Sequence, residues 1–174
     1  MLANRLVIIT GMSGSGKSTA LKAFEDMGYF CVDNLPAPML TNFVDFLMNI
    51  PEQWSHYPSS VRGNVSEERT KNPSSEWRFA LLVDCREESS FPDINSAVEK
   101  LKKSGTEVSH LFLDCSDEIL VKRFRETRRP HPILMVDSSL KTLSEALNKE
   151  RSLLSKFREV ATRIIDTTSF SIHQ

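Results

Sequence analysis

Residues 6–18 read LVIITGMSGSGKS, and this stretch decides the fold class. Residues 6–10 are a continuous, largely β-branched run, which is typical of a strand that is covered on both faces. Residues 11–18 match the pattern G-x-x-x-x-G-K-[ST] in full. A helical pattern follows from about residue 17 to residue 27. A strand, a glycine-rich turn and a helix in this order predict a loop that binds phosphate groups.

The residue types in this loop suit a nucleoside triphosphate. Glycines let the chain wrap so that its N–H groups point inward, and the start of the helix adds partial positive charge. Lys17 can reach the β and γ phosphates, and the Ser18 hydroxyl can ligate Mg²⁺. We therefore expect ATP or GTP with Mg²⁺ as ligands. The expected contact residues in this stretch are Gly11, Met12, Ser13, Gly14, Ser15, Gly16, Lys17, Ser18 and Thr19.

The rest of the chain alternates short apolar runs with helical patterns. This alternation predicts an α/β P-loop NTPase fold, nucleotide-kinase-like, with a five-stranded parallel sheet and helices on both faces. Further strands are expected at 29–32, 79–83, 108–113 and 163–166, and the last and longest helix at 139–160.

Length and composition indicate one domain. The chain has 174 residues, of which 40% are hydrophobic and 26% charged, an ordinary globular mixture. We expect a single domain over 1–174. Residues 51–78 hold three prolines, Pro51, Pro58 and Pro73, and almost no apolar periodicity, which predicts a long surface insertion.

Carboxylates follow several of the expected strands. Asp84 directly follows the apolar run 80–83, as does the carboxylate that holds the Mg²⁺ shell in P-loop proteins. Asp114 follows the apolar run 111–113 in the same way and is the alternative candidate. We favour Asp84, with Ser18, as the metal-binding pair. Asp33 follows the second expected strand and can act as a base or substrate ligand, or can form an Asx turn.

Residues 122–129 carry five basic side chains, namely Lys122, Arg123, Arg125, Arg128 and Arg129, against one acid, Glu126. In P-loop kinases a mobile lid follows the fourth strand, and arginines there stabilise charge on the transferred phosphate. The alternatives are a solvated helix face or a surface for RNA or a protein partner. The expected catalytic residues are Lys17, Asp33, Arg128 and Arg129.

Charge and composition argue against several classes of protein. The formal net charge is -1, so no global basic excess indicates nucleic-acid binding. Three widely spaced cysteines give neither a disulfide framework nor a zinc signature. The apolar runs are too short to cross a bilayer, and a strand that starts at residue 6 leaves no room for a signal peptide. We expect an intracellular, cytoplasmic protein; a plastid protein whose targeting segment had been removed would look the same.

Five segments occur in the order found in the RapZ/YvcJ family, and on them the chain resembles that family. They are residues 11–18, Asp33-Asn-Leu-Pro36, Asp84-Cys-Arg-Glu87, residues 124–132 with the sequence FRETRRPHP, and residues 165–168 with the sequence IDTT. The resemblance covers nearly the whole chain except residues 51–78, and it implies a P-loop nucleotide-binding protein.

The resemblance also implies roles for two of these segments. It assigns the loop at 11–18 to ATP and the string Asp84, Cys85, Arg86 and Glu87 to GTP, and it implies hydrolysis of both nucleotides. Some members of the family are adapters in the control of small RNAs by an RNase. That role depends on a C-terminal domain for RNA and sugar phosphates, which we expect to be absent from this chain.

Three functions remain compatible with the sequence. The first is a regulatory protein that binds ATP or GTP and hydrolyses it slowly with Mg²⁺. The second is a small-molecule or nucleotide kinase that uses Asp33 and the arginine-rich segment as acceptor site and lid. The third is a binding module whose nucleotide only sets the shape of a partner surface. The fold alone does not decide among them.

Overall fold

A computed structural model describes residues 4–49, 77–85 and 90–170 of the chain. The expected insertion at 51–78 lies almost entirely outside these ranges and stays a prediction. Its last two residues belong to the sheet region: Trp77 is buried against Phe79, with ring centroids 5.6 Å apart, and Arg78 begins a strand.

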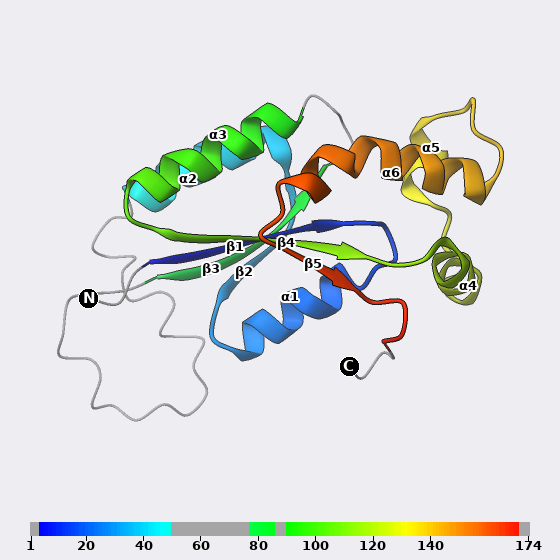
Figure 1. Ribbon diagram of the computed structural model, residues 1–174, viewed down its shortest axis with the longest axis horizontal. Coiled ribbons are helices and arrows are strands. Elements are labelled where there is room, and N and C mark those ends of the chain that lie inside the picture. The colour runs from blue at the N-terminus through cyan, green and yellow to red at the C-terminus, as the bar shows by residue number, and fades with distance from the viewer. Residues whose placement is uncertain (1–3, 50–76, 86–89, 171–174) are drawn as a thin grey trace.

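The centre of the molecule is a five-stranded sheet in the order β2-β3-β1-β4-β5 (Figure 1). Every neighbouring pair of strands is parallel, as predicted. The central strands are apolar and almost wholly buried, whereas the edge strand β5 is largely exposed. The strands are β1 (Arg5–Gly11), β2 (Phe30–Pro36), β3 (Arg78–Asp84), β4 (Glu107–Asp114) and β5 (Arg163–Asp166).

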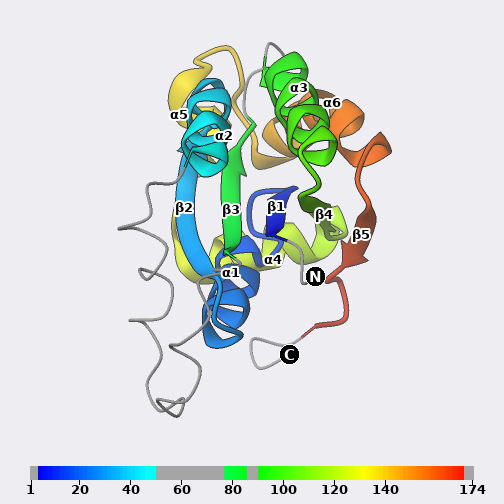
Figure 2. The same cartoon turned by 90° about the vertical axis from the view of Figure 1, so that its left-hand side faces the viewer.

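Helices cover both faces of this sheet. One helix, α1, lies on one face, while α2, α3 and α6 lie on the other (Figures 1 and 2). The helical segments are α1 (Lys17–Asp26), η1 (Ala37–Met39), α2 (Leu40–Met48), α3 (Ser90–Lys103), α4 (Asp117–Thr127), α5 (Pro132–Val136) and α6 (Leu143–Glu159).

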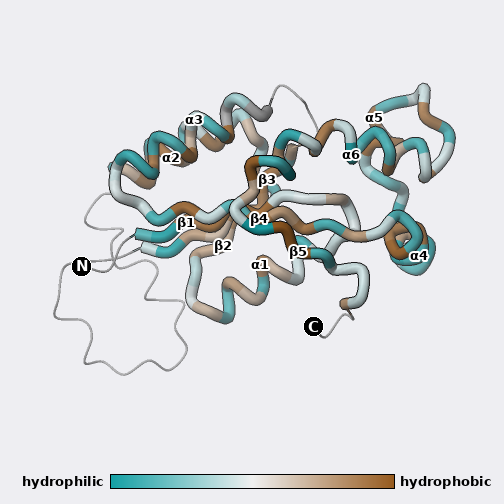
Figure 3. The backbone as a smooth tube through the Cα atoms, in the orientation of Figure 1, coloured by the Kyte–Doolittle hydropathy of each residue, from teal (hydrophilic) through white to brown (hydrophobic). Residues whose placement is uncertain are grey.

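Alternation along β1 divides the core between the two faces. Leu6 and Ile8 pack with the apolar residues of α2, α3 and α6, while Val7 and Ile9 pack with Leu21 of α1. Successive strand residues point to opposite faces, so a continuous apolar run requires cover on both sides. The apolar residues lie on the strands and on the inward faces of the helices (Figure 3). The predicted fold class, a P-loop NTPase fold with helices on both faces, is confirmed.

The structure differs most from the sequence prediction at the second strand, at residues 132–136 and at the start of the last helix. The second strand continues to Pro36 through a register shift between Val32 and Leu35 and a positive φ of 54° at Asn34. A short helix, α5, begins at Pro132, the last residue of the segment 124–132, because Pro132 suits the first turn of a helix. The last helix begins at Leu143 rather than near 139, because Thr142 and Glu145 form a capping box there.

Candidate functional site

The phosphate loop, residues 11–18, lies directly against the end of β4. Gly11 has a φ of 134°, and a Cβ atom built there would lie 2.1 Å from the Leu113 carbonyl oxygen. The Met12 N–H donates to the same oxygen at 3.1 Å. Only glycine fits this position, so the first glycine of the motif is needed for the approach of the loop to the sheet.

The loop then turns into α1 through two more glycines with positive φ. Gly14 has a φ of 84° and Gly16, the N-cap of α1, a φ of 95°. No acidic residue lies in the first turn of α1, which leaves the partial positive charge of its N-terminus uncompensated from within the helix. Ser15 is fully buried, and its hydroxyl has no hydrogen-bond partner among the described residues. This geometry suits an anion at the loop.

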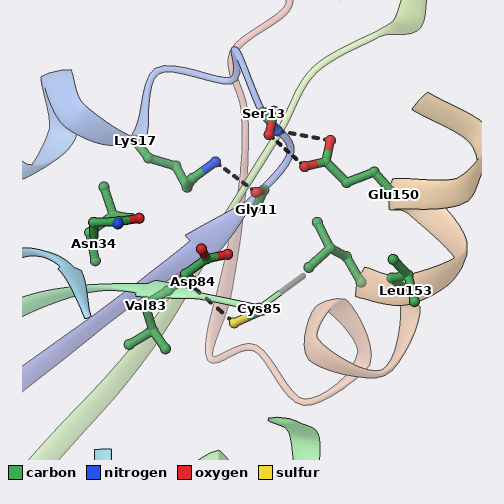
Figure 4. A pocket seen from close by; sticks show the side chains of 11 residues that line it. Gly11, Ser13, Lys17, Asn34, Val83, Asp84, Cys85, Glu150 and Leu153 are labelled. Carbon is green, nitrogen blue, oxygen red and sulfur yellow. Dashed lines mark hydrogen bonds between the residues drawn. The ribbon is translucent and has the colours of Figure 1, made fainter. Parts of the chain in front are cut away.

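Lys17 projects from the start of α1 back across the loop. Its ammonium donates to the Gly11 carbonyl oxygen at 2.8 Å (Figure 4) and to the Met12 carbonyl oxygen at 2.8 Å. The same side chain lines a pocket of about 430 Å³, a volume that includes space open to solvent. The pocket is lined by Gly11, Ser13, Lys17, Asn34, Leu82, Val83, Asp84, Cys85, Glu150, Leu153 and Leu154.

The structure separates the two candidate metal-binding carboxylates. Asp84, at the end of β3, lines the pocket with Lys17. Asp114 is instead engaged by α6: it accepts from Arg151 at 2.9 Å and from Arg158 at 3.2 Å. Partial burial acts to raise the pKa of Asp114, but the hydrogen bonds from Arg151 and Arg158 outweigh it and hold this pKa below its ordinary value. Asp114 therefore has a structural ion-pair role, and the geometry favours Asp84 at the pocket.

A buried carboxylate that the sequence analysis did not single out also lies in the pocket. Glu150 of α6 accepts from the Ser13 N–H at 3.0 Å and from the Ser13 hydroxyl at 2.6 Å (Figure 4). Its Oε2 lies 3.2 Å from Nε2 of His131, which is itself 1% exposed. The signal in the sequence was a glutamate in the apolar row of a helix, between Leu147 and Leu154.

Glu150 is ionised despite its burial. Burial favours the neutral carboxyl and acts to raise the pKa, but hydrogen bonds from His131 and Ser13 and the charge of Lys17 outweigh this effect. The pKa of Glu150 therefore lies below its ordinary value. Cys85, by contrast, is a neutral thiol, because burial and the nearby Asp84 charge raise its pKa to about 12.

Several expected site residues lie away from the pocket lining. Asp33 is exposed within β2, and its neighbour Asn34 lines the pocket instead. Arg128 and Arg129 are exposed at the end of α4. Ser18 and Thr19 are in the first turn of α1 and exposed, but they do not line the pocket. Arg86 and Glu87 lie outside the described residues, so half of the expected GTP string is not placed.

Arg123 of the basic segment is held by backbone groups rather than directed at the pocket. It donates to the carbonyl oxygen of Gly14 at 3.0 Å and to that of Thr167 at 2.8 Å. The Thr167 hydroxyl in turn donates to the Ser15 carbonyl at 2.9 Å. The chain after β5 is thereby fastened to the outside of the phosphate loop.

The donor set fits a cation only together with a phosphate ligand. Among residues 4–49, 77–85 and 90–170, no group of three or more His, Cys, Asp or Glu side chains could hold a metal ion. Asp84 offers one carboxylate in the pocket beside the loop, whereas the other carboxylate there, Glu150, is already bound to Ser13 and His131. Mg²⁺ is commonly bound in this way, by one or two protein oxygens with waters and the phosphates of a nucleotide.

A parallel sheet in this order, with a glycine-rich loop between β1 and α1 and a lysine in the pocket, defines a P-loop nucleotide-binding protein. A family model, the RapZ-like N-terminal domain, matches residues 4–62 and 56–174. The chain belongs to this family, as the resemblance in its sequence indicated.

Curated relatives of the chain are named nucleotide-binding proteins. The chain is 38% identical over 168 residues to a nucleotide-binding protein of Kocuria rhizophila, covering 97% of this chain and 47% of that protein. It is 39% identical over 174 residues to a nucleotide-binding protein of Geotalea daltonii, covering 98% of this chain and 50% of the relative. The chain thus spans about half the length of the curated relatives it matches.

Solved structures with a similar chain path include small kinases. A gluconokinase from Sinorhizobium meliloti matches with a TM-score of 0.46 at 16% identity, covering 98% of this chain and 85% of the kinase. A shikimate kinase from Acinetobacter baumannii matches with a TM-score of 0.47 at 16% identity, covering 95% of this chain and 84% of the kinase. Likeness at this level does not bear on the activity of this chain.

None of the helices in the described parts of the chain combines the length and the apolar character needed to span a membrane.

Proposed function

We propose that this chain binds a nucleoside triphosphate with Mg²⁺ at the phosphate loop and hydrolyses it slowly, in a regulatory role. The observation that carries the proposal is the shared pocket. A complete phosphate loop places Lys17 in the same pocket as the carboxylate of Asp84. These are the two charged groups that a bound Mg²⁺–triphosphate requires from the protein.

Each part of the chain has a distinct task in this reaction. The loop amides and Lys17 hold the phosphates, while Asp84 and the Ser18 hydroxyl hold the cation. This role requires the Ser18 side chain to turn toward the pocket, because it does not line the pocket in this structure. When bound, Mg²⁺ neutralises charge on the phosphates and orients them for attack by water. Arg128 or Arg129 offsets charge on the terminal phosphate, which requires the segment after α4 to approach the pocket, because neither side chain lines it in this structure.

Either ATP or GTP is compatible with this proposal, because it rests on groups that contact phosphate and metal rather than the base. The family assigns the string that begins at Asp84 to GTP. Since Asp84 and Cys85 line the same pocket as Lys17, we propose that one pocket serves both nucleotides. Competition between ATP and GTP for the wild-type protein tests this point.

The test is release of phosphate from ATP and from GTP with Mg²⁺, with Lys17→Ala as the variant and Lys22→Ala as the matched control. Lys22 is exposed on the same helix and does not line the pocket. We expect slow release by the wild type and by Lys22→Ala, and none by Lys17→Ala. Equal rates for all three proteins would contradict the site. Tight binding without release would favour a binding module that uses nucleotide only to shape a partner surface.

A kinase is the second candidate, and the pocket wall on the side of β2 favours it. Asn34, at a positive φ, directs a polar side chain to the same pocket as Lys17, where an acceptor hydroxyl would need a partner. Adding nucleosides, nucleotides and sugars to the same assay separates the two proposals. Faster turnover with one acceptor, reduced in Asn34→Ala, would support a kinase, and turnover that ignores every acceptor would support the hydrolase.

A further inference from the structure

We propose that Glu150, oriented by His131, is a specificity-determining residue that makes binding of the terminal phosphate depend on a divalent cation. This inference rests on the proposed binding of a nucleoside triphosphate in the same pocket, and it assigns to Glu150 a role that the phosphate-loop motif does not contain.

The first step is the position of the carboxylate. Glu150 accepts from both the N–H and the hydroxyl of Ser13, the third residue of the loop. The Ser13 N–H of the phosphate loop thus already donates to a carboxylate of the protein rather than to a phosphate. Lys17, the residue that reaches the β and γ phosphates in such loops, lines the same pocket as Glu150. A terminal phosphate beside Lys17 therefore lies near Glu150.

The second step is that Glu150 is held rigidly. Nδ1 of His131 accepts the N–H of Ile133 at 3.2 Å, so the neutral ring carries its proton on Nε2 and donates it to Glu150. The ring also packs on Phe124, with centroids 5.1 Å apart. With 5% of Glu150 and 1% of His131 exposed, the carboxylate has little freedom to turn away from an incoming phosphate.

The third step is the charge of the pocket. Among the described residues that line it, one ammonium, Lys17, faces two carboxylates, Asp84 and Glu150, which leaves one net negative charge. A triphosphate without a cation brings further negative charge to this place. A cation held by Asp84 and the phosphates offsets the repulsion from Glu150. A diphosphate lacks the terminal phosphate and is less affected.

The experiment is calorimetric titration of ATP and of ADP, each with Mg²⁺ and each with a chelator, into wild type, Glu150→Gln and Glu159→Gln. Glutamine keeps an oxygen that can accept the Ser13 N–H but removes the charge. Glu159, exposed at the end of the same helix, gives the matched charge change. With the chelator, we expect Glu150→Gln to bind ATP about tenfold more tightly than the wild type, with a smaller change for ADP and none in Glu159→Gln.

Three results overturn the inference. Equal changes in ATP and ADP affinity, with and without Mg²⁺, would show that Glu150 only supports the loop, and the proposed nucleotide binding would stand. Absence of nucleotide binding to the wild type under every condition would overturn both proposals. If Glu150→Gln does not fold, the titrations of the wild type provide the test. Mg²⁺ must then increase the affinity for ATP more than the affinity for ADP, and equal increases for the two nucleotides would overturn the inference.

Discussion

At Gly11, a hydrogen atom in place of a side chain lets the phosphate loop lie on the end of β4. In Gly11→Ala the new methyl group would meet the Leu113 carbonyl at 2.1 Å, at a φ of 134° that alanine rarely adopts. We expect the free energy of unfolding to fall by more than about 3 kcal/mol, because steric overlap adds to backbone strain. Urea denaturation followed by circular dichroism measures this change.

Gly28→Ala is the control, because it introduces backbone strain without a steric contact. It follows α1 with a φ of 80°, and nothing lies within 4 Å of a Cβ built there. Gly28→Ala should therefore cost only about 1 kcal/mol, the ordinary penalty of a left-handed alanine. If the two variants were equally stable, the close approach of the loop to β4 would not be needed for folding.

Among the elements, the start of α6 depends on its capping box. Thr142 accepts the N–H of Glu145 at 3.2 Å, and the Glu145 carboxylate accepts the N–H of Thr142 at 2.9 Å. We expect Thr142→Ala to lower the free energy of unfolding by about 1 kcal/mol. Ser155→Ala, which removes an exposed hydroxyl from the same helix, should change it by less than about 0.5 kcal/mol. Equal losses in the two variants would contradict a capping role.

The pairing of β1 with β4 contains a histidine that makes stability depend on pH. The Thr10 hydroxyl lies 2.7 Å from Nε2 of His110, and burial lowers the pKa of His110 to about 4, against 6.5 for an ordinary histidine. The unfolded chain therefore binds a proton between these values that the folded protein does not bind, so stability falls as pH drops below 6.5. From pH 7.5 to pH 5 we expect a loss of about 2 kcal/mol from this group.

The variant His110→Gln isolates this contribution, because glutamine does not titrate. The wild type and the variant should differ in stability by a smaller amount at pH 5 than at pH 7.5, as followed by urea denaturation at each pH. A difference that is independent of pH would show that His110 has no role in the acid sensitivity of the sheet.

The elements of this fold were predictable from the sequence to the extent that local patterns determine them. The strand–glycine loop–helix unit at 6–27 and the β-branched runs could be predicted from their own residues alone, and all five expected strands are present in the sheet. The start of α6 was misplaced because Leu140 continues the apolar spacing, while the cap at Thr142 ends it. Glu150 was missed as a site residue because its contact with Ser13 joins segments 137 residues apart.

On the scale of the whole molecule, Arg123 connects parts of the chain that are distant in sequence. From α4 its guanidinium reaches Gly14 in the phosphate loop, Thr167 after β5, and the Phe170 carbonyl at 3.3 Å. The planar group with its several donors can serve these acceptors together, which a lysine ammonium on a flexible stem does less well. Order in the phosphate loop should therefore depend on order after β5.

We expect Arg123→Lys to loosen the phosphate loop and the chain after β5 at the same time. Amide hydrogen exchange should become faster at residues 13–18 and at 167–170 together, and the free energy of unfolding should fall by about 2 kcal/mol, as expected for lost hydrogen bonds to a charged group. Arg125→Lys is the matched control, because Arg125 is exposed on the same helix. Faster exchange at 167–170 alone would mean that the loop is held by its own glycines and by β4, and that Arg123 fastens only the chain after β5.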